Sequence, residues 1–151
     1  MISIIFFCDE EGNRIPPKNR YIDPILNQIE QNGDIAIVEK MSNFACLYNE
    51  KGDNTEKIKK NKNVIDVIKI EEITSEMNTL KKHAEKWGKK LKDETFVVRV
   101  DRKGNHKYTS VELEKELGAV IWKISKCDVD LKKPQKTYRV FIQNKRAFVG
   151  V

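Results

Sequence analysis

The chain has 151 residues, 39% of them hydrophobic and 34% charged, with a net charge of +6. This length suits one ordinary domain or two small ones. Its three cysteines (Cys8, Cys46 and Cys127) lie far apart without a Cys-x-x-Cys pair, which argues against a zinc site and a disulfide framework and favours a cytoplasmic location. No apolar run approaches the roughly 20 residues that span a bilayer, and the opening residues lack the basic start of a signal peptide.

The first seventy residues predict the order strand–helix–strand–strand–helix–strand. The first helix is expected to begin at Asp23 as N-cap, with Pro24 at the first helical position, and to end at Gly33. A short helix over residues 54–61 would reach the sheet only through Ile58. The strands are expected over Ser3–Cys8, Ile35–Glu39, Phe44–Asn49 and Val64–Ile70. This order is the ferredoxin-like pattern, and we assign residues 1–73 to a ferredoxin-like domain.

The segment Thr74–Leu91 predicts a long helix. Its apolar residues recur at spacings of three and four, which forms one stripe of Met77, Leu80, Ala84, Trp87 and Leu91. His83 lies on the flank of that stripe and is expected to be a surface or capping residue.

A strand is expected over Phe96–Arg102, with Arg99 and Arg102 on opposite faces. The pair Thr109 and Glu112 has the form of a capping box, which places the start of the next helix at that threonine. The apolar stripe of this helix is Leu113, Leu117, Val120 or Ile121, and Ile124, and Gly118 within it suggests close backbone packing. Two final strands, Tyr138–Ile142 and Ala147–Val151, would form a hairpin around Asn144 and Lys145.

The two halves of the chain differ in charge. Residues 1–70 hold 10 basic and 11 acidic residues, a net charge of −1, whereas residues 71–151 hold 19 basic and 12 acidic residues, a net charge of +7. Such asymmetry suggests that the second half faces a polyanion. A lysine-rich surface that is merely solvated is the alternative reading.

The turn between the Phe96–Arg102 strand and the following helix combines features that suit a phosphate. It carries Lys103 and Lys107 and leads into a helix whose first N–H groups follow Thr109. The alternative is a polar turn in which Tyr108 anchors the helix start. An improvised catalytic site there could use only His106 with Lys107, Tyr108 and Asp101, and this lone histidine on a solvated turn has no evident acid partner, so catalysis there is not expected.

Three pieces in order, FVVRVDRKGNHKYTS (96–110), ELG (116–118) and VDLKKPQ (129–135), resemble a THUMP domain. This RNA-binding module occurs in tRNA 4-thiouridine synthetases, in RNA methyltransferases and in the adaptor of tRNA cytidine acetylation. The resemblance implies an α+β protein in which a THUMP domain, residues 74–151, follows the ferredoxin-like unit. The candidate RNA-binding residues are Arg99, Arg102, Lys103, His106, Lys107, Tyr108, Thr109, Ser110, Lys123, Lys126, Lys132 and Lys133.

The catalytic motifs of THUMP-bearing enzymes are missing from the sequence. It contains no Ser-Gly-Gly-x-Asp loop, no Asp-Pro-Pro-Tyr motif, no zinc deaminase pair and no Walker sequence. We therefore expect that the chain is not an enzyme and needs no cofactor or metal.

The expected function is that of a non-catalytic tRNA-binding protein that presents tRNA, gripped by its acceptor end, to a separate modification enzyme. An acetyltransferase is the favoured partner by resemblance. The alternatives are the RNA-binding half of a split thiolation or methylation enzyme, or a protein-interaction module with incidental RNA binding. The oligomeric state and the modified nucleotide stay open.

Overall fold

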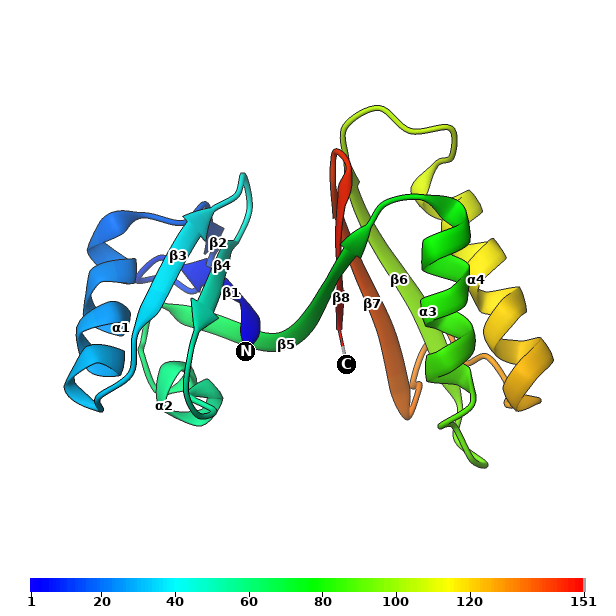
Figure 1. Cartoon of the computed structure of the whole chain (residues 1–151), viewed down its shortest axis with the longest axis horizontal. Helices are drawn as coiled ribbons and strands as arrows, with labels where there is room; N and C mark the ends of the chain where they lie inside the picture. Colours follow the sequence, from blue (N-terminus) through cyan, green and yellow to red (C-terminus); the bar gives the residue numbers. More distant parts are fainter. Residues whose placement is uncertain (151) are drawn as a thin grey trace. The chain divides into compact units, whose positions relative to one another are not determined.

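The computed structural model describes residues 1–150, and the chain consists of two compact units whose boundary along the chain lies between Ile70 and Glu71. Strand β5 (Val64–Thr74) carries the chain from the first unit into the second (Figure 1). The unit boundary coincides with the change in net charge along the sequence.

The first unit has the ferredoxin-like order expected from the sequence. Strand β1 (Ile2–Cys8) lies between β4 and β5, and β4 pairs in turn with β3, all in antiparallel fashion. A two-residue strand β2 (Arg14–Ile15), which the sequence did not suggest, pairs with the end of β1. The remaining elements are α1 (Asn19–Gln31), β3 (Ala36–Lys40), β4 (Ala45–Asn49) and α2 (Thr55–Lys59).

Helix α1 begins earlier than its sequence signals predict. Asn19 is its first residue and Lys18 its cap, so Pro24 lies inside the helix and Asp23 is not the N-cap. The early start adds Ile22 to the buried face formed by Ile25 and Ile29. Burial of such a side chain is worth about 1.5–3 kcal/mol, which offsets much of the cost of about 3 kcal/mol for a proline within a helix.

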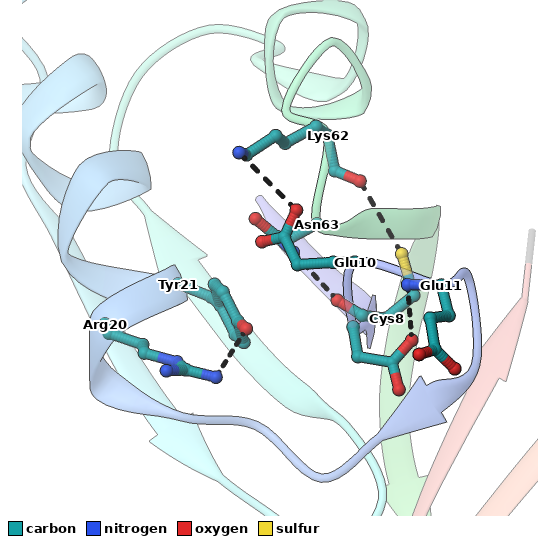
Figure 2. A network of polar contacts seen from close by, with 8 residues as sticks. Cys8, Glu10, Glu11, Arg20, Tyr21, Lys62 and Asn63 are labelled. Atoms are coloured by element: carbon teal, nitrogen blue, oxygen red, sulfur yellow. Dashed lines mark hydrogen bonds and ion pairs between the residues drawn. The ribbon is translucent and has the colours of Figure 1, made fainter.

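Cys8 is a buried structural thiol at the junction of β1 and β5. Its thiol donates to the carbonyl of Lys62 over 3.6 Å, and the Asn63 amide donates to the carbonyl of Cys8 over 3.0 Å (Figure 2). Glu10 completes the group with an ion pair to Lys62 at 3.6 Å. Cys46 and Cys127 are buried as well.

The second unit contains α3 (Met77–Gly88), β6 (Phe96–Lys103), α4 (Ser110–Ser125), β7 (Lys136–Gln143) and β8 (Arg146–Gly150). Strand β6 runs parallel to β7, β7 is antiparallel to β8, and the order β5-β8-β7-β6 leaves β6 at the edge. Helices α3 and α4 cover one face of these strands (Figure 1). The hairpin around Asn144 is confirmed, although Val151 lies outside the described residues.

Helix α3 begins at Met77, three residues later than expected, because β5 continues to Thr74. Ser75 holds this extension in place: its N–H donates to the Lys145 carbonyl over 3.0 Å and its hydroxyl to the Asn144 carbonyl over 2.9 Å. Within α3 the apolar stripe is as expected, since Leu80 and Ala84 are fully buried in the core of this unit, but the helix ends at Gly88, and the buried Leu91 lies beyond it.

Close helix packing occurs at Gly88 and not at Gly118. A Cβ atom at Gly88 would lie 3.4 Å from the Cα atom of Ile121 on α4, whereas one at Gly118 would meet only Val98 Cγ2 at 4.0 Å. The expectation about Gly118 is therefore wrong. Buried Leu113, Leu117 and Ile121 form the α4 face as expected, whereas Ile124, expected in the same stripe, is 38% exposed.

Within residues 1–150, no helix has both the length and the apolar composition that crossing a membrane requires.

Candidate nucleic-acid interface

The turn between β6 and α4 packs against the turn between β7 and β8. Gly104 adopts φ +113°, and a Cβ atom there would lie 3.1 Å from the Cα atom of Asn144 and closer still to its side-chain oxygen. The Lys103 carbonyl accepts a 2.8 Å hydrogen bond from the Asn144 N–H. Only glycine fits this approach, so the basic turn is fixed by a second turn about forty residues away.

Arg102 and His106 brace the basic turn from within. One Arg102 Nη atom donates to the Gly104 carbonyl over 2.7 Å and to His106 Nδ1 over 3.0 Å. Because Nδ1 accepts, the neutral ring carries its proton on Nε2, which donates to the Asn144 carbonyl. Both side chains are therefore engaged in holding the turn.

Tyr108, one of the candidate RNA-binding residues, is buried and offers little surface to RNA. Its hydroxyl donates to the Ser75 carbonyl over 2.6 Å, and burial raises the pKa of the phenol. The ring also lies 5.2 Å from that of His106 at an angle of 20°. Tyr108 thus anchors the start of α4 to the end of β5, as in the alternative interpretation of the turn.

The lysines of this turn point outward from the braced backbone. Lys103 and Lys107 are exposed, and neither has an ion pair or side-chain hydrogen bond among the described residues. Thr109 caps α4 as expected, because its hydroxyl accepts from the Glu112 N–H over 3.1 Å, and Ser110 is the first residue of the helix. Two free cations and a positive helix end therefore share one surface.

Arg99, Lys132 and Lys133 form a second basic group beside the edge strand. Arg99 donates to the Leu131 carbonyl over 2.9 Å, and Asp130 accepts the backbone N–H groups of Lys132 and Lys133 at 2.9 and 3.0 Å. The N–H groups of Lys133 and Lys132 hold the pKa of Asp130 below its usual value. This segment is consequently a defined turn with two lysine side chains exposed.

Lys123 and Lys126 lie at the far end of α4. The helix has 16 residues, a length of roughly 24 Å, so these lysines are remote from the basic turn. Lys126 caps the helix with φ +58°, and its ammonium group lies 4.6 Å from the centre of the Trp122 ring.

His83 is mostly buried, with 12% of its side chain exposed, rather than the surface or capping residue expected from its place on α3. Its Nδ1 atom lies 2.6 Å from the Tyr138 hydroxyl and its Nε2 atom 2.9 Å from Glu71. Burial, followed by the charge of Glu71, raises the pKa of Tyr138. The partners come from β5 and β7, so only the tertiary structure reveals this network.

The THUMP domain pattern matches residues 69–151, which is more than half of the chain. The chain belongs to the THUMP domain family.

Known proteins resemble this chain in sequence and in fold. A probable tRNA sulfurtransferase of Sulfurisphaera tokodaii is 27% identical over 99% of this chain and 40% of its own length. A tRNA (guanine(6)-N2)-methyltransferase of Thermus thermophilus is 37% identical over 38% of this chain and 17% of its own length. The structure of a 4-thiouridine synthetase bound to RNA and ATP has the same fold, with a TM-score of 0.73, 20% identity, and coverage of 99% of this chain and 40% of that one.

These relatives contradict the expectation that the chain is not an enzyme. The sulfurtransferase, the methyltransferase and the synthetase are enzymes by name, and this chain spans 40% of the sulfurtransferase. The reasoning from missing motifs was wrong because a motif absent from the matched part of an enzyme says nothing of the enzyme as a whole.

Proposed function

We propose that this chain is the tRNA-binding part of a tRNA-modification enzyme. THUMP-family membership supports this function, and so does the RNA bound to the 4-thiouridine synthetase that shares the fold. The observation that carries the proposal is the braced turn between β6 and α4, where the exposed Lys103 and Lys107 lie beside the N-terminus of α4.

The geometry of this turn suits a phosphodiester backbone. Arg102, His106 and Gly104 are engaged in fixing the turn, so its exposed lysines are presented from a rigid base. A rigid base reduces the entropy lost on binding, and each lysine neutralises one phosphate. The proposed phosphate contacts of this turn are therefore Lys103 and Lys107, and the buried Tyr108 is no longer among the proposed contacts.

Thiolation is the modification that the relatives favour, and methylation is the second candidate. The sulfurtransferase of Sulfurisphaera tokodaii aligns with nearly the whole chain, whereas the methyltransferase aligns with little more than a third of it. Both fit the idea of an RNA-binding part of a thiolation or methylation enzyme better than the acetyltransferase partner first favoured.

Removal of the two turn lysines tests the proposal. The double substitution Lys103→Ala with Lys107→Ala is expected to weaken tRNA binding by roughly 1–3 kcal/mol, the loss of two phosphate contacts, without lowering the unfolding temperature. The matched control is Lys57→Ala with Lys59→Ala on α2 in the near-neutral first unit, which is expected to bind tRNA as the unchanged chain does. Fluorescence anisotropy of labelled tRNA measures both, and equal losses from the two pairs would contradict the assignment.

A further inference from the structure

An apolar groove lies between the edge strand β6 and helix α4 in the second unit. Its volume is about 480 Å³, and its walls include Val98, Ala119, Trp122 and Leu131. Val111, Trp122, Val129 and Leu131 all border it and are 49–67% exposed, although they are large hydrophobic residues. A gathering of exposed apolar side chains around one hollow marks a binding surface.

The edge of β6 already accepts an extended segment at one end of this groove. The Phe96 N–H donates to the Asp128 carbonyl over 3.0 Å, and the Phe96 carbonyl accepts from the Asp130 N–H over 2.9 Å, as a parallel bridge to Val129. In a strand, the backbone N–H and C=O groups of every second residue point to the same edge, so those of Val98 point to the same edge as those of Phe96. Two residues beyond Val98, the Glu114 carboxylate accepts a hydrogen bond from the Val100 N–H over 3.0 Å.

Charges around the groove select an acidic occupant. Arg99 and Lys115 line its rim, and Lys132 and Lys133 follow Leu131 in the chain. Glu114 in the lining and Asp128 and Asp130 on either side of Val129 offset part of this positive charge, and Glu114 and Asp130 also accept backbone hydrogen bonds. The rim therefore attracts negative charge while the floor accepts only apolar groups.

A protein segment fits this surface better than a nucleobase does. A base edge carries donors and acceptors, and burial without partners costs about 1–3 kcal/mol for each group. The groove has almost no polar lining, whereas a strand that pairs with Val98 places alternate aliphatic side chains on an apolar floor.

We infer that the groove docks an extended segment of the catalytic part of the enzyme, with aliphatic residues at alternate positions and acidic residues at its ends. This inference rests on the proposed function, because a tRNA-binding part has to be held to the part that performs the chemistry. The strand adds to the edge of β6 at Val98, and one aliphatic side chain fills the space between Ala119, Trp122 and Leu131.

A labelled peptide with two glutamates, Val-Ile-Val and two further glutamates tests the inference with the full chain. The expected result is saturable binding by fluorescence anisotropy, at least about tenfold tighter than for the twin peptide with lysine at the glutamate positions, because the rim is basic. Amide hydrogen exchange at Val98 is expected to slow when the peptide is bound. Absence of binding, or a preference for the lysine peptide, would overturn the inference.

Matched variants locate the site and separate it from tRNA binding. Leu131→Ser and Ala119→Gln change two residues that line the groove, one after α4 and one on it, and are expected to weaken peptide binding about tenfold. Ile124→Ser, at an exposed α4 residue outside the groove, is expected to leave peptide binding unchanged. None of the three is expected to alter tRNA affinity. If the groove variants weaken tRNA binding and leave peptide binding unchanged, the groove binds RNA and the inference is overturned. The proposed tRNA-binding function is tested separately, by the loss of tRNA binding when Lys103 and Lys107 are replaced.

Discussion

At the scale of single residues, the basic turn depends on a residue with no side chain. Gly104 lets the turn after β6 touch the hairpin turn at Asn144, and Arg102 and His106 then close hydrogen bonds across the contact. The exposed lysines owe their fixed position to these neighbours. The lysines proposed to bind tRNA and the residues that brace the turn are therefore different groups within one short segment.

Gly104→Ala is expected to destabilise the protein by roughly 2–3 kcal/mol, because the new methyl group clashes with Asn144 and φ +113° strains any side chain. Urea unfolding measures the change. The matched control is Gly52→Ala, where φ is +60° but no atom lies within 4 Å, so only the conformational cost of about 1 kcal/mol is expected. Equal losses at both positions would show that the contact with Asn144 contributes nothing.

Asp53 gives a residue-scale prediction of pH dependence. Its hydrogen bond with Lys69, followed by those with Thr55, holds the pKa of the carboxyl well below its usual value. A depressed pKa in the folded state stabilises the fold at pH values above about 4, where the unfolded carboxyl is also ionised, and this contribution is lost as the pH falls further. Asp53→Asn is therefore expected to lower the unfolding temperature at pH 7 and to match the unchanged chain in strong acid, as thermal melts across pH would show.

At the scale of elements, the packing of α3 on α4 is decided where the two helices come closest. Gly88 at the end of α3 lies against the backbone of Ile121, and the stripes of both helices converge on the core behind β6 and β7. Gly118 faces the groove side of α4 and has space around it. The two glycines therefore differ in their surroundings although both lie within helices.

Gly118→Ala is expected to stabilise the protein by roughly 0.5–1 kcal/mol, because alanine favours the helix and its methyl group meets Val98 only at 4.0 Å. Gly88→Ala is expected to bring no gain, since its methyl group would press on Ile121 at 3.4 Å. Thermal unfolding of the two variants side by side provides the measurement. A greater gain at Gly88 than at Gly118 would contradict the assigned contact.

At the scale of the whole molecule, the division into two units follows the division of charge. The first unit is close to neutral and the second carries a net charge of +7. Long-range attraction for a polyanion thus comes from the unit that matches the THUMP domain pattern. Phosphate contacts, rather than recognition of bases, are expected to supply most of the affinity.

The salt dependence of tRNA binding tests this expectation. If about four to six phosphates are contacted, log K is expected to fall with log[salt] at a slope of about −3 to −5. Filter binding at several salt concentrations gives the slope, with duplex DNA of similar length as the control. A flat dependence, or equal affinity for the two nucleic acids, would count against the tRNA-binding proposal.

The sequence by itself determined the order of the main elements, most of each apolar stripe, the capping of α4 by Thr109 and the difference in charge, because each can be read along the chain without knowledge of distant contacts. Local signals gave the wrong start for α1, because the free energy gained by burying Ile22 offset much of the cost of a proline within the helix. They also gave the wrong surroundings for Tyr108, His83 and Gly118. Their partners, Ser75, Tyr138 and Val98, lie about 20 to 55 residues away in the chain. Only the tertiary structure decided which cations are free and where the apolar groove opens, because both depend on contacts between segments that folding alone brings together.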